Sequence, residues 1–403
     1  MKDHFVGNTL VNMYAKCGEL AKAQEVFNEL PIQDIVSWNV LISGYAHYGH
    51  NQEALHCFEQ MKLKRGLSPN SVTFVCALKA CGNIGDCVLG QEIHVDIIKR
   101  KLLTNELVGN ALVNMYAGCG LLVKSREVFD ELSVHNVVSW NALITAYYNN
   151  QCEEDALHCF EQMQLCGLSP DGVTFLCIIK ACGNVGSSNK GQEIHAQIVG
   201  GGFLGKDITI GNALVDMYAR SGTLTKAQEV FNELPTQNVI AWNALIAGYS
   251  NHGQDENAWY CFQQMRLHGL LPDIVTFSCV LKACASAKAS GKGQEIHAQI
   301  VRNVSLHKDV IVGNALLDMY AKSGMLSKAQ DLFNELKFCD VVTWNVLIGG
   351  YVQHGHGEEG LKCFEDMQLC GISPNVVTFI CSLKACSIIG ATVKGEEIHA
   401  EIE

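Results

Sequence analysis

The chain has 403 residues, of which 48% are hydrophobic and 17% are charged, and its formal net charge is −12. This composition excludes an intrinsically disordered chain, because disordered segments combine low hydrophobicity with a high density of charge. The net negative charge is also the opposite of the positive charge that most nucleic-acid-binding domains carry.

In chain order, the sequence is an array of three repeated segments. The first reads HFVGNTLVNMYAKCG from His4, the second reads IVSWNVLISGYAHYG from Ile35, and the third reads SVTFVCALKACGNIG from Ser71. All three return in the same order every 102 residues or within one residue of that step. Each segment therefore has roughly 34 residues, which is the length of a two-helix solenoid repeat. We call the segments the short, standard and long units.

The array predicts a single solenoid domain of residues 4–403, made of twelve units with the last one partial. The short units are 4–34, 106–136, 208–238 and 310–340; the standard units are 35–70, 137–171, 239–273 and 341–375; the long units are 71–105, 172–207, 274–309 and 376–403.

The standard unit 239–273 illustrates the local pattern. Trp242, Leu245, Ile246 and Tyr249 follow the spacing of a helix with one buried stripe, and Gly253 interrupts the pattern before a second stripe begins. Two short helices cannot bury their stripes alone, so neighbouring units must supply the missing surface. The predicted fold is all-α, a right-handed α-solenoid superhelix of tandem helix-turn-helix repeats.

Most of the nineteen cysteines fall at fixed repeat positions, and no CxxC motif occurs. We therefore expect buried small side chains in a reducing compartment, with no disulfide framework, no metal site and no cofactor. Four aligned histidines also recur once per 102 residues, too far apart to share an ion, and are predicted to lie in the core or at an interface. They are His94, His195, His297 and His399.

An asparagine occupies the fifth position of every short and standard unit. In the short units these are Asn8, Asn110, Asn212 and Asn314, and in the standard units Asn39, Asn141, Asn243 and Asn345. Asparagine forms helices poorly, so its recurrence in a helix needs a reason. One interpretation is an N-terminal cap. The other is that the amides point into a groove and pair with a repetitive ligand, such as single-stranded nucleic acid with one base per repeat.

The motifs WNxLIxGY, GNALVDMYAKxG and VTFxxxLKAC resemble those of the pentatricopeptide repeat family, and the unit order resembles its plant organellar branch with alternating standard, long and short repeats. The resemblance implies single-stranded RNA binding, in which the fifth and last residues of a unit select the base. The implied pairs are Asn8 with Asp34, Asn39 with Asn70, Asn110 with Asn136, Asn141 with Asp171, Asn212 with Asn238, Asn243 with Asp273, Asn314 with Asp340, and Asn345 with Asn375.

In that family, Asn followed by Asp favours uracil, and Asn followed by Asn favours cytosine or uracil. The implied target is pyrimidine-rich: U, Y, gap, Y, U, gap, Y, U, gap, U, Y, where Y is either pyrimidine. The gaps are the long units, which depart from the code with Val75, Leu176, Ser278 and Ile380 at the fifth position. The aliphatic second residues are expected to pack against base faces; they are Val36, Val138, Ile240 and Val342.

The resemblance also implies an adaptor role in organellar RNA editing or processing, with an editing or processing factor acting in trans. A mitochondrion or chloroplast is the implied location, although MKDHFVGN enters a repeat at once and no transit peptide precedes it; no membrane partner is expected. We expect no enzymatic activity, because His356-Gly357-Glu358 matches half of a deaminase motif and no PCxxC follows.

Two alternatives stay open. The chain could be a protein-binding helical-repeat scaffold of the tetratricopeptide type. The same Asn at one position of eight units argues against this alternative, because a peptide-binding groove does not require the same amide in every repeat. It could also be a fragment of a longer repeat protein without its effector segment, which is compatible with RNA binding.

Overall fold

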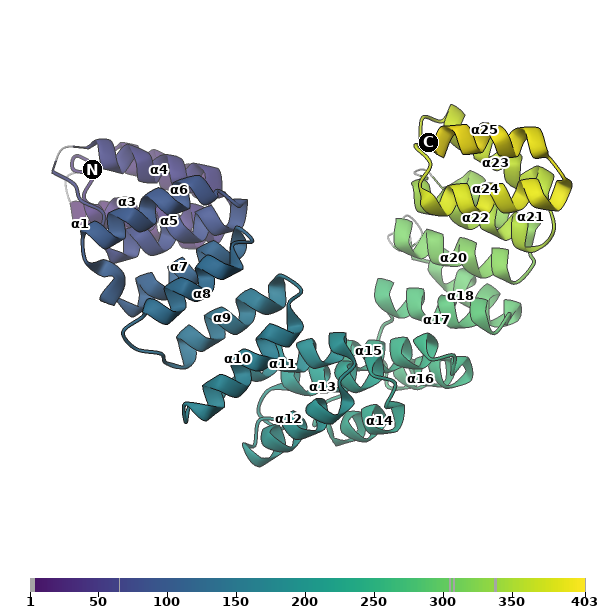
Figure 1. The fold of residues 1–403 in the computed structure, drawn as a ribbon, viewed down its shortest axis with the longest axis horizontal. Helices are drawn as coiled ribbons and strands as arrows, with labels where there is room; N and C mark the ends of the chain where they lie inside the picture. Colours follow the sequence, from purple (N-terminus) through teal and green to yellow (C-terminus); the bar gives the residue numbers. More distant parts are fainter. Residues whose placement is uncertain (1–3, 65, 304–305, 307–308, 337–338, 403) are drawn as a thin grey trace. The chain divides into compact units, whose positions relative to one another are not determined.

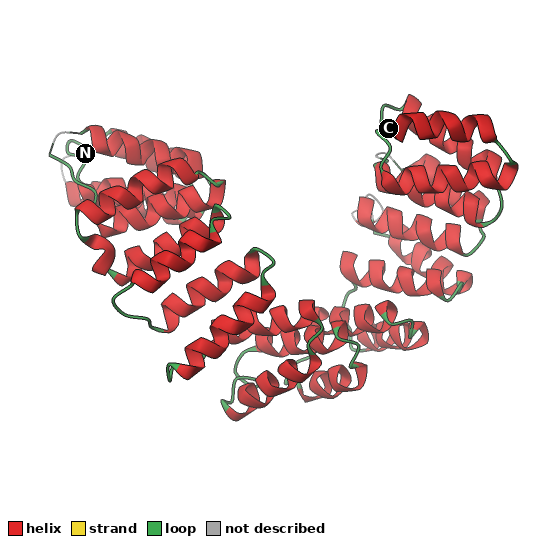
Figure 2. Ribbon diagram, in the orientation of Figure 1, coloured by secondary structure: helices red, strands yellow, loops and turns green. Residues whose placement is uncertain are grey.

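In the computed structural model, the described residues are 4–64, 66–303, 306, 309–336 and 339–402. Glu403, the predicted end of the twelfth unit, lies outside them. Within these ranges the chain forms 24 α-helices and one 3₁₀ turn, η1 (Leu102–Thr104), and no strand (Figure 2). The prediction of an all-α helical-repeat solenoid is confirmed, whereas the division into short, standard and long units stays a prediction.

Along the chain, twelve first helices alternate with twelve second helices. The first helices are α1 (His4–Lys16), α3 (Ile35–His47), α5 (Ser71–Ile84), α7 (Glu106–Gly118), α9 (Val137–Asn149), α11 (Gly172–Val185), α13 (Ile208–Arg220), α15 (Val239–Asn251), α17 (Ile274–Ser286), α20 (Val310–Lys322), α22 (Val341–Gln353) and α24 (Val376–Ile389). The second helices are α2 (Leu20–Asn28), α4 (Asn51–Leu63), α6 (Cys87–Lys99), α8 (Leu122–Glu131), α10 (Glu153–Leu165), α12 (Ser188–Gly200), α14 (Leu224–Glu233), α16 (Asp255–Leu267), α18 (Ser290–Val301), α21 (Leu326–Glu335), α23 (Gly357–Leu369) and α25 (Thr392–Ile402) (Figure 1).

Within each of two compact parts, Met1–Lys190 and Gly191–Glu403, neighbouring first helices pack side by side. Helix α13, for example, contacts both its own partner α14 and the first helix of the next pair, α15. The predicted stripe of α15 is buried, since Leu245 and Ile246 are fully enclosed and Trp242 packs edge-on against Phe231 with ring centroids 4.5 Å apart. Gly253 takes a φ of +70° after this helix, as the sequence predicts.

The chain divides into two compact parts, Met1–Lys190 and Gly191–Glu403. Each part contains four of the Asn pairs predicted to bind RNA. None of the helices described is long and apolar enough to cross a membrane. In the same described residues, no three His, Cys, Asp or Glu side chains gather as a metal site would require.

The repeated cysteines are free thiols that pack as apolar side chains. Two of their three repeat positions are buried, as Cys57 and Cys81 illustrate, and the third, with Cys76, is half-buried. Burial raises the pKa of Cys57 to about 11 and that of Cys81 to about 12, with nearby acidic groups adding to the shift. The thiolate, which is the reactive form, is therefore disfavoured.

Three of the four aligned histidines lie at an interface between consecutive helix pairs, which confirms that prediction for them. The Nδ1 atom of His94 lies 2.8 Å from the hydroxyl oxygen of Tyr116, and His195 makes the same contact with Tyr218 at 3.1 Å. His297 repeats it with Tyr320 at 2.8 Å. The contact joins the second helix of a long unit to the first helix of the next short unit.

Candidate nucleic-acid interface

The last residue of each short and standard unit caps the next first helix. Its side-chain oxygen accepts a hydrogen bond from the backbone N–H three residues later, at 2.8 to 3.1 Å; the eight caps are Asp34, Asn70, Asn136, Asp171, Asn238, Asp273, Asp340 and Asn375. The fifth-position asparagines lie one turn inside the helix. The interpretation of those asparagines as N-terminal caps is therefore wrong. The cap of the standard-unit helices is the last residue of the short unit, and the cap of three short-unit helices is Asn105, Asp207 or Asp309.

Six of the eight predicted pairs are joined by a hydrogen bond from the asparagine amide to the last residue. In the standard units the donor-acceptor distance between Asn Nδ2 and the nearer oxygen is 3.1 Å for Asn39 to Asn70, 3.0 Å for Asn141 to Asp171, 3.0 Å for Asn243 to Asp273 and 3.1 Å for Asn345 to Asn375. In the short units it is 3.2 Å for Asn8 to Asp34 and 3.5 Å for Asn314 to Asp340.

Among the described residues, no hydrogen bond joins the other two pairs, Asn110 with Asn136 and Asn212 with Asn238. Asn136 donates instead to a carboxylate oxygen of Glu106 at 2.7 Å. The side-chain oxygens of Asn110 and Asn212 are buried and have no hydrogen-bond partner in the described part of the chain. Asn110 and Asn136 nevertheless line one small cavity, together with Glu106.

A threonine at the third position of the following long unit contacts the Asn of three standard units. The hydroxyl groups of Thr73, Thr174 and Thr276 donate to the side-chain oxygens of Asn39, Asn141 and Asn243, each at 2.6 Å. The three threonines are fully buried. Sequence reasoning missed them, although a cap followed three residues later by Thr, as in Asp171-Gly-Val-Thr174, is a recognisable helix-start signal.

The carboxylates of Asp171 and Asp273 are held in their ionised form. Burial by itself raises the pKa of Asp171, but hydrogen bonds from the Thr174 backbone N–H and the Asn141 amide outweigh it, so the pKa lies below its usual value. The same opposing effects lower the pKa of Asp273. Each Asp pair therefore presents a charged acceptor next to an amide donor.

The predicted base-packing residues are exposed, although they are aliphatic. The exposed fraction is 52% for Val36, 58% for Val138, 63% for Ile240 and 50% for Val342. The second residue of each long unit is just as exposed, a feature that the sequence analysis did not single out; these residues are Val72, Val173, Val275 and Val377. Exposed apolar side chains therefore flank the Asn pair of each standard unit on both sides.

Cavities bring these groups together. One of about 700 Å³ is lined by Val36, Asn39, Asn70 and Val72, and by Lys16 of the preceding helix pair. A second, of about 370 Å³, is lined by the equivalent residues Val342, Asn345, Asn375 and Val377, with Lys322. The structure thus places a polar pair, two aliphatic side chains and a cation around one space in each of these two standard units.

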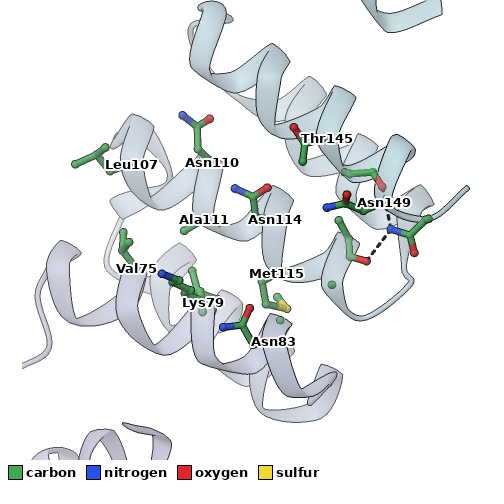
Figure 3. Close-up of a pocket in the computed structure, with 16 residues that line it drawn as sticks. Val75, Lys79, Asn83, Leu107, Asn110, Ala111, Asn114, Met115, Thr145 and Asn149 are labelled. Carbon is green, nitrogen blue, oxygen red and sulfur yellow. Dashed lines mark hydrogen bonds between the residues drawn. The ribbon is translucent and has the colours of Figure 1, made fainter. Parts of the chain in front are cut away.

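A third cavity, of about 600 Å³, lies between a long and a short unit (Figure 3). Val75 and Lys79 of α5 line it together with Leu107 and Asn110 of α7. Lysine recurs at this ninth position of every long unit, and all four side chains are exposed: Lys79, Lys180, Lys282 and Lys384. The long units therefore bring positive charge, rather than an amide, to the surface made by the first helices.

Comparison with known proteins matches the repeats directly. Residues 33–83, 135–184, 237–286 and 339–387 match the PPR repeat family, and residues 8–33, 110–137, 212–239 and 314–341 match the PPR repeat. Together these segments cover most of the chain.

Curated relatives are similar over nearly the whole chain. The chain is 36% identical to pentatricopeptide repeat-containing protein At3g09040, mitochondrial, from Arabidopsis thaliana, over 99% of this chain and 38% of that protein. It is 32% identical to At1g15510, chloroplastic, from the same plant, over 98% of this chain and 46% of that protein. The chain thus spans about two fifths to a half of the length of these relatives.

A solved structure shows the same fold. The crystal structure of the pentatricopeptide repeat protein PPR10 in complex with an 18-nt psaJ RNA element matches with a TM-score of 0.59 at 20% identity, over 98% of this chain and 70% of that one. With matched repeats and similarity to two such relatives over nearly its full length, the chain belongs to the pentatricopeptide repeat family.

Proposed function

We propose that this chain binds pyrimidine-rich single-stranded RNA along the surface of its first helices, with one base at each short and standard unit. The observation that carries the proposal is the repeated pair of an Asn amide and a capping Asn or Asp, set beside exposed aliphatic side chains. An amide donor next to an oxygen acceptor matches the Watson-Crick edge of a pyrimidine, and the aliphatic groups match its faces.

The proposal includes the alternating short, standard and long repeat type and RNA running with its 5′ end toward the N-terminus. PPR10 was crystallised in complex with an RNA element, which supports RNA as the ligand class. We further propose that the chain acts as an adaptor for RNA editing or processing in a mitochondrion or chloroplast. The names of the relatives, one mitochondrial and one chloroplastic, support an organellar location.

The acidic net charge does not oppose binding if cations are concentrated where the RNA lies. Lys16, Lys79 and Lys384 line cavities on the first-helix surface. Lys322 lies there too, paired with Asp318 at 2.8 Å. Binding should therefore depend on salt while being weaker than that of a strongly basic RNA-binding domain.

The test is the affinity of the chain for an RNA of the predicted pyrimidine pattern, compared with its purine-swapped version and with a DNA copy, at two salt concentrations. A preference for the predicted RNA supports base readout. Equal affinity for the pyrimidine and purine strands would reject it, and the absence of binding at both salt concentrations would reject RNA binding.

A variant with both Asn141→Ala and Asn243→Ala should lose preference for uracil at the two corresponding positions, by about 2- to 10-fold for each lost hydrogen bond. Asn232→Ala is the matched control. Asn232 lies on the second helix α14, where it accepts a hydrogen bond from Gln228 at 3.0 Å, and its replacement should leave RNA selectivity unchanged.

A further inference from the structure

A third polar residue, at the third position of the following long unit, contacts the base-reading pair of a standard unit. In the unit that ends at Asp171, the hydroxyl oxygen of Thr174 accepts from the backbone N–H of Asp171 at 3.2 Å and lies 2.6 Å from Asn141 Oδ1 and 3.0 Å from Asp171 Oδ1. A hydroxyl has one hydrogen to donate. The shorter distance assigns that hydrogen to Asn141.

This assignment fixes which way the Asn141 amide faces. Its oxygen is turned inward to a fully buried hydroxyl, and its nitrogen donates to the Asp171 carboxylate. Reversing the amide would place its oxygen against that carboxylate, which is repulsive. One N–H of the amide then remains for a ligand, next to a carboxylate that can only accept.

Two other standard units repeat the arrangement. Thr73 binds Asn39 and Thr276 binds Asn243 through the same atoms, again at 2.6 Å. After the fourth standard unit, the hydroxyl of Thr378 donates to Asn375 at 3.1 Å instead, and the Asn345 oxygen has no hydrogen-bond partner among the described residues. The arrangement is therefore a property of particular units and not of the repeat as such.

The short units lack the contact within the described structure. The residue at the place of Thr174 is Ser37, Ser139, Ala241 or Thr343. Ser37 and Ser139 donate to the backbone carbonyl of the cap at 2.8 Å, and Thr343 donates to the Asp340 side chain at 2.8 Å. In the same ranges the side-chain oxygens of Asn110, Asn212 and Asn314 are buried and accept no hydrogen bond.

We propose that Thr73, Thr174 and Thr276 are specificity-positioning residues, which hold the fifth-position amide with its N–H toward the RNA and so sharpen base selection at three standard units. The inference rests on the proposed function. It predicts that the Asn141 and Asn243 positions, with Asp partners, discriminate uracil from cytosine more strongly than the short-unit positions do. Uracil offers an acceptor oxygen beside an N–H donor, which complements an amide N–H beside a carboxylate.

The experiment compares Thr174→Val with wild type in the full chain. Valine keeps the size and removes the hydroxyl. The readout is the ratio of affinities for two RNAs that differ only by uracil or cytosine at the position facing Asn141. We expect the ratio to fall by about 2- to 10-fold, which corresponds to the loss of one hydrogen bond.

Thr343→Val is the matched control. Thr343 is also fully buried and accepts from the backbone N–H of its cap, Asp340, at 3.2 Å, but its hydroxyl makes no hydrogen bond with Asn314 in the described structure. Its replacement removes the same capping contact, and the uracil-to-cytosine ratio at the Asn314 position should be unchanged. The midpoint of thermal unfolding, measured for both variants, shows how much stability each loses with the capping hydrogen bond.

The outcomes separate the inference from the proposed function. If wild type distinguishes the two RNAs and Thr174→Val does so equally, the positioning role is overturned while base readout stands. If Thr343→Val loses as much selectivity as Thr174→Val, the effect belongs to helix capping and the inference is also overturned. If wild type does not distinguish pyrimidine from purine strands, both proposals are rejected.

Discussion

Asn141 and Asp171, thirty residues apart, share one hydrogen-bonded contact: the amide nitrogen of Asn141 lies 3.0 and 3.1 Å from the two carboxylate oxygens of Asp171. Replacing Asp171 by Asn exchanges one acceptor for a donor and keeps a good N-terminal cap. We expect Asp171→Asn to bind cytosine and uracil RNAs with similar affinity at that position, measured as the ratio of the two dissociation constants.

Helix capping by residue 171 provides a control for the Asp171→Asn variant, because it can be measured as stability. Because Asn caps helices about as well as Asp, the midpoint of thermal unfolding should change little. An unaltered uracil preference in Asp171→Asn would contradict the role of the last residue in base selection.

A lysine variant tests where the RNA backbone runs. Lys79 lines the cavity between α5 and α7 (Figure 3). If it contacts a phosphate, Lys79→Ala should weaken binding equally for all RNA sequences and reduce the slope of log affinity against log salt by about 0.7. The slope is measured by titration at several salt concentrations.

Lys292→Ala serves as the comparison. Lys292 lies on the second helix α18 and pairs with Glu256 at 2.7 Å. The same loss of charge there should leave the salt slope unchanged; an equal decrease in both variants would indicate a general charge effect and not a phosphate contact.

Two half-buried histidines, His94 and His195, should make stability depend on pH. Burial lowers the pKa of His94 below 6.5, Glu131 opposes the shift and Lys124 adds to it; burial also lowers the pKa of His195. The unfolded chain therefore binds protons first as the pH falls. Stability is complete above about pH 6.5 and declines below it, by at most about 1.4 kcal/mol per pH unit for each histidine.

Unfolding at pH 7 and pH 5, by temperature or denaturant, measures this decline. The double variant His94→Phe with Tyr116→Phe removes the titrating ring and its hydroxyl partner together, so that no polar group is left unpaired. It should show a smaller loss of stability at pH 5 than wild type. An equal loss would assign the pH dependence to other groups.

Close packing of α5 and α7 leaves no space for a side chain at Gly118. A Cβ atom there would lie 2.4 Å from the carbonyl oxygen of Gly82, which belongs to the backbone and cannot move aside easily. Gly118→Ala should destabilise the chain by about 1 to 3 kcal/mol. Gly291→Ala, in α18 and with no atom within 4 Å of the added Cβ, should not; equal stability of the two variants would contradict the contact.

The helix pairs could be predicted from the sequence because a buried stripe with helical spacing is a local pattern, as at Trp242 and Leu245 of α15. The contact between Thr174 and Asn141 could not, since it joins residues 33 apart on two different helices. Nor could the hydrogen bond that Asn136 donates to Glu106, because His, Ile or Val stands at the position of Glu106 in the other short units.

The last residue of a short or standard unit caps the next helix, and in the proposed function its side chain also selects the base. Only Asn, Asp, Ser and Thr accept well from the first backbone N–H groups, and replacing one of them by Ala costs about 0.5 to 2 kcal/mol. Helix capping alone therefore restricts the residue types that this position tolerates, independently of any ligand. If this side chain also selects the base, as proposed, new specificities can arise there only among these few residue types without weakening the array.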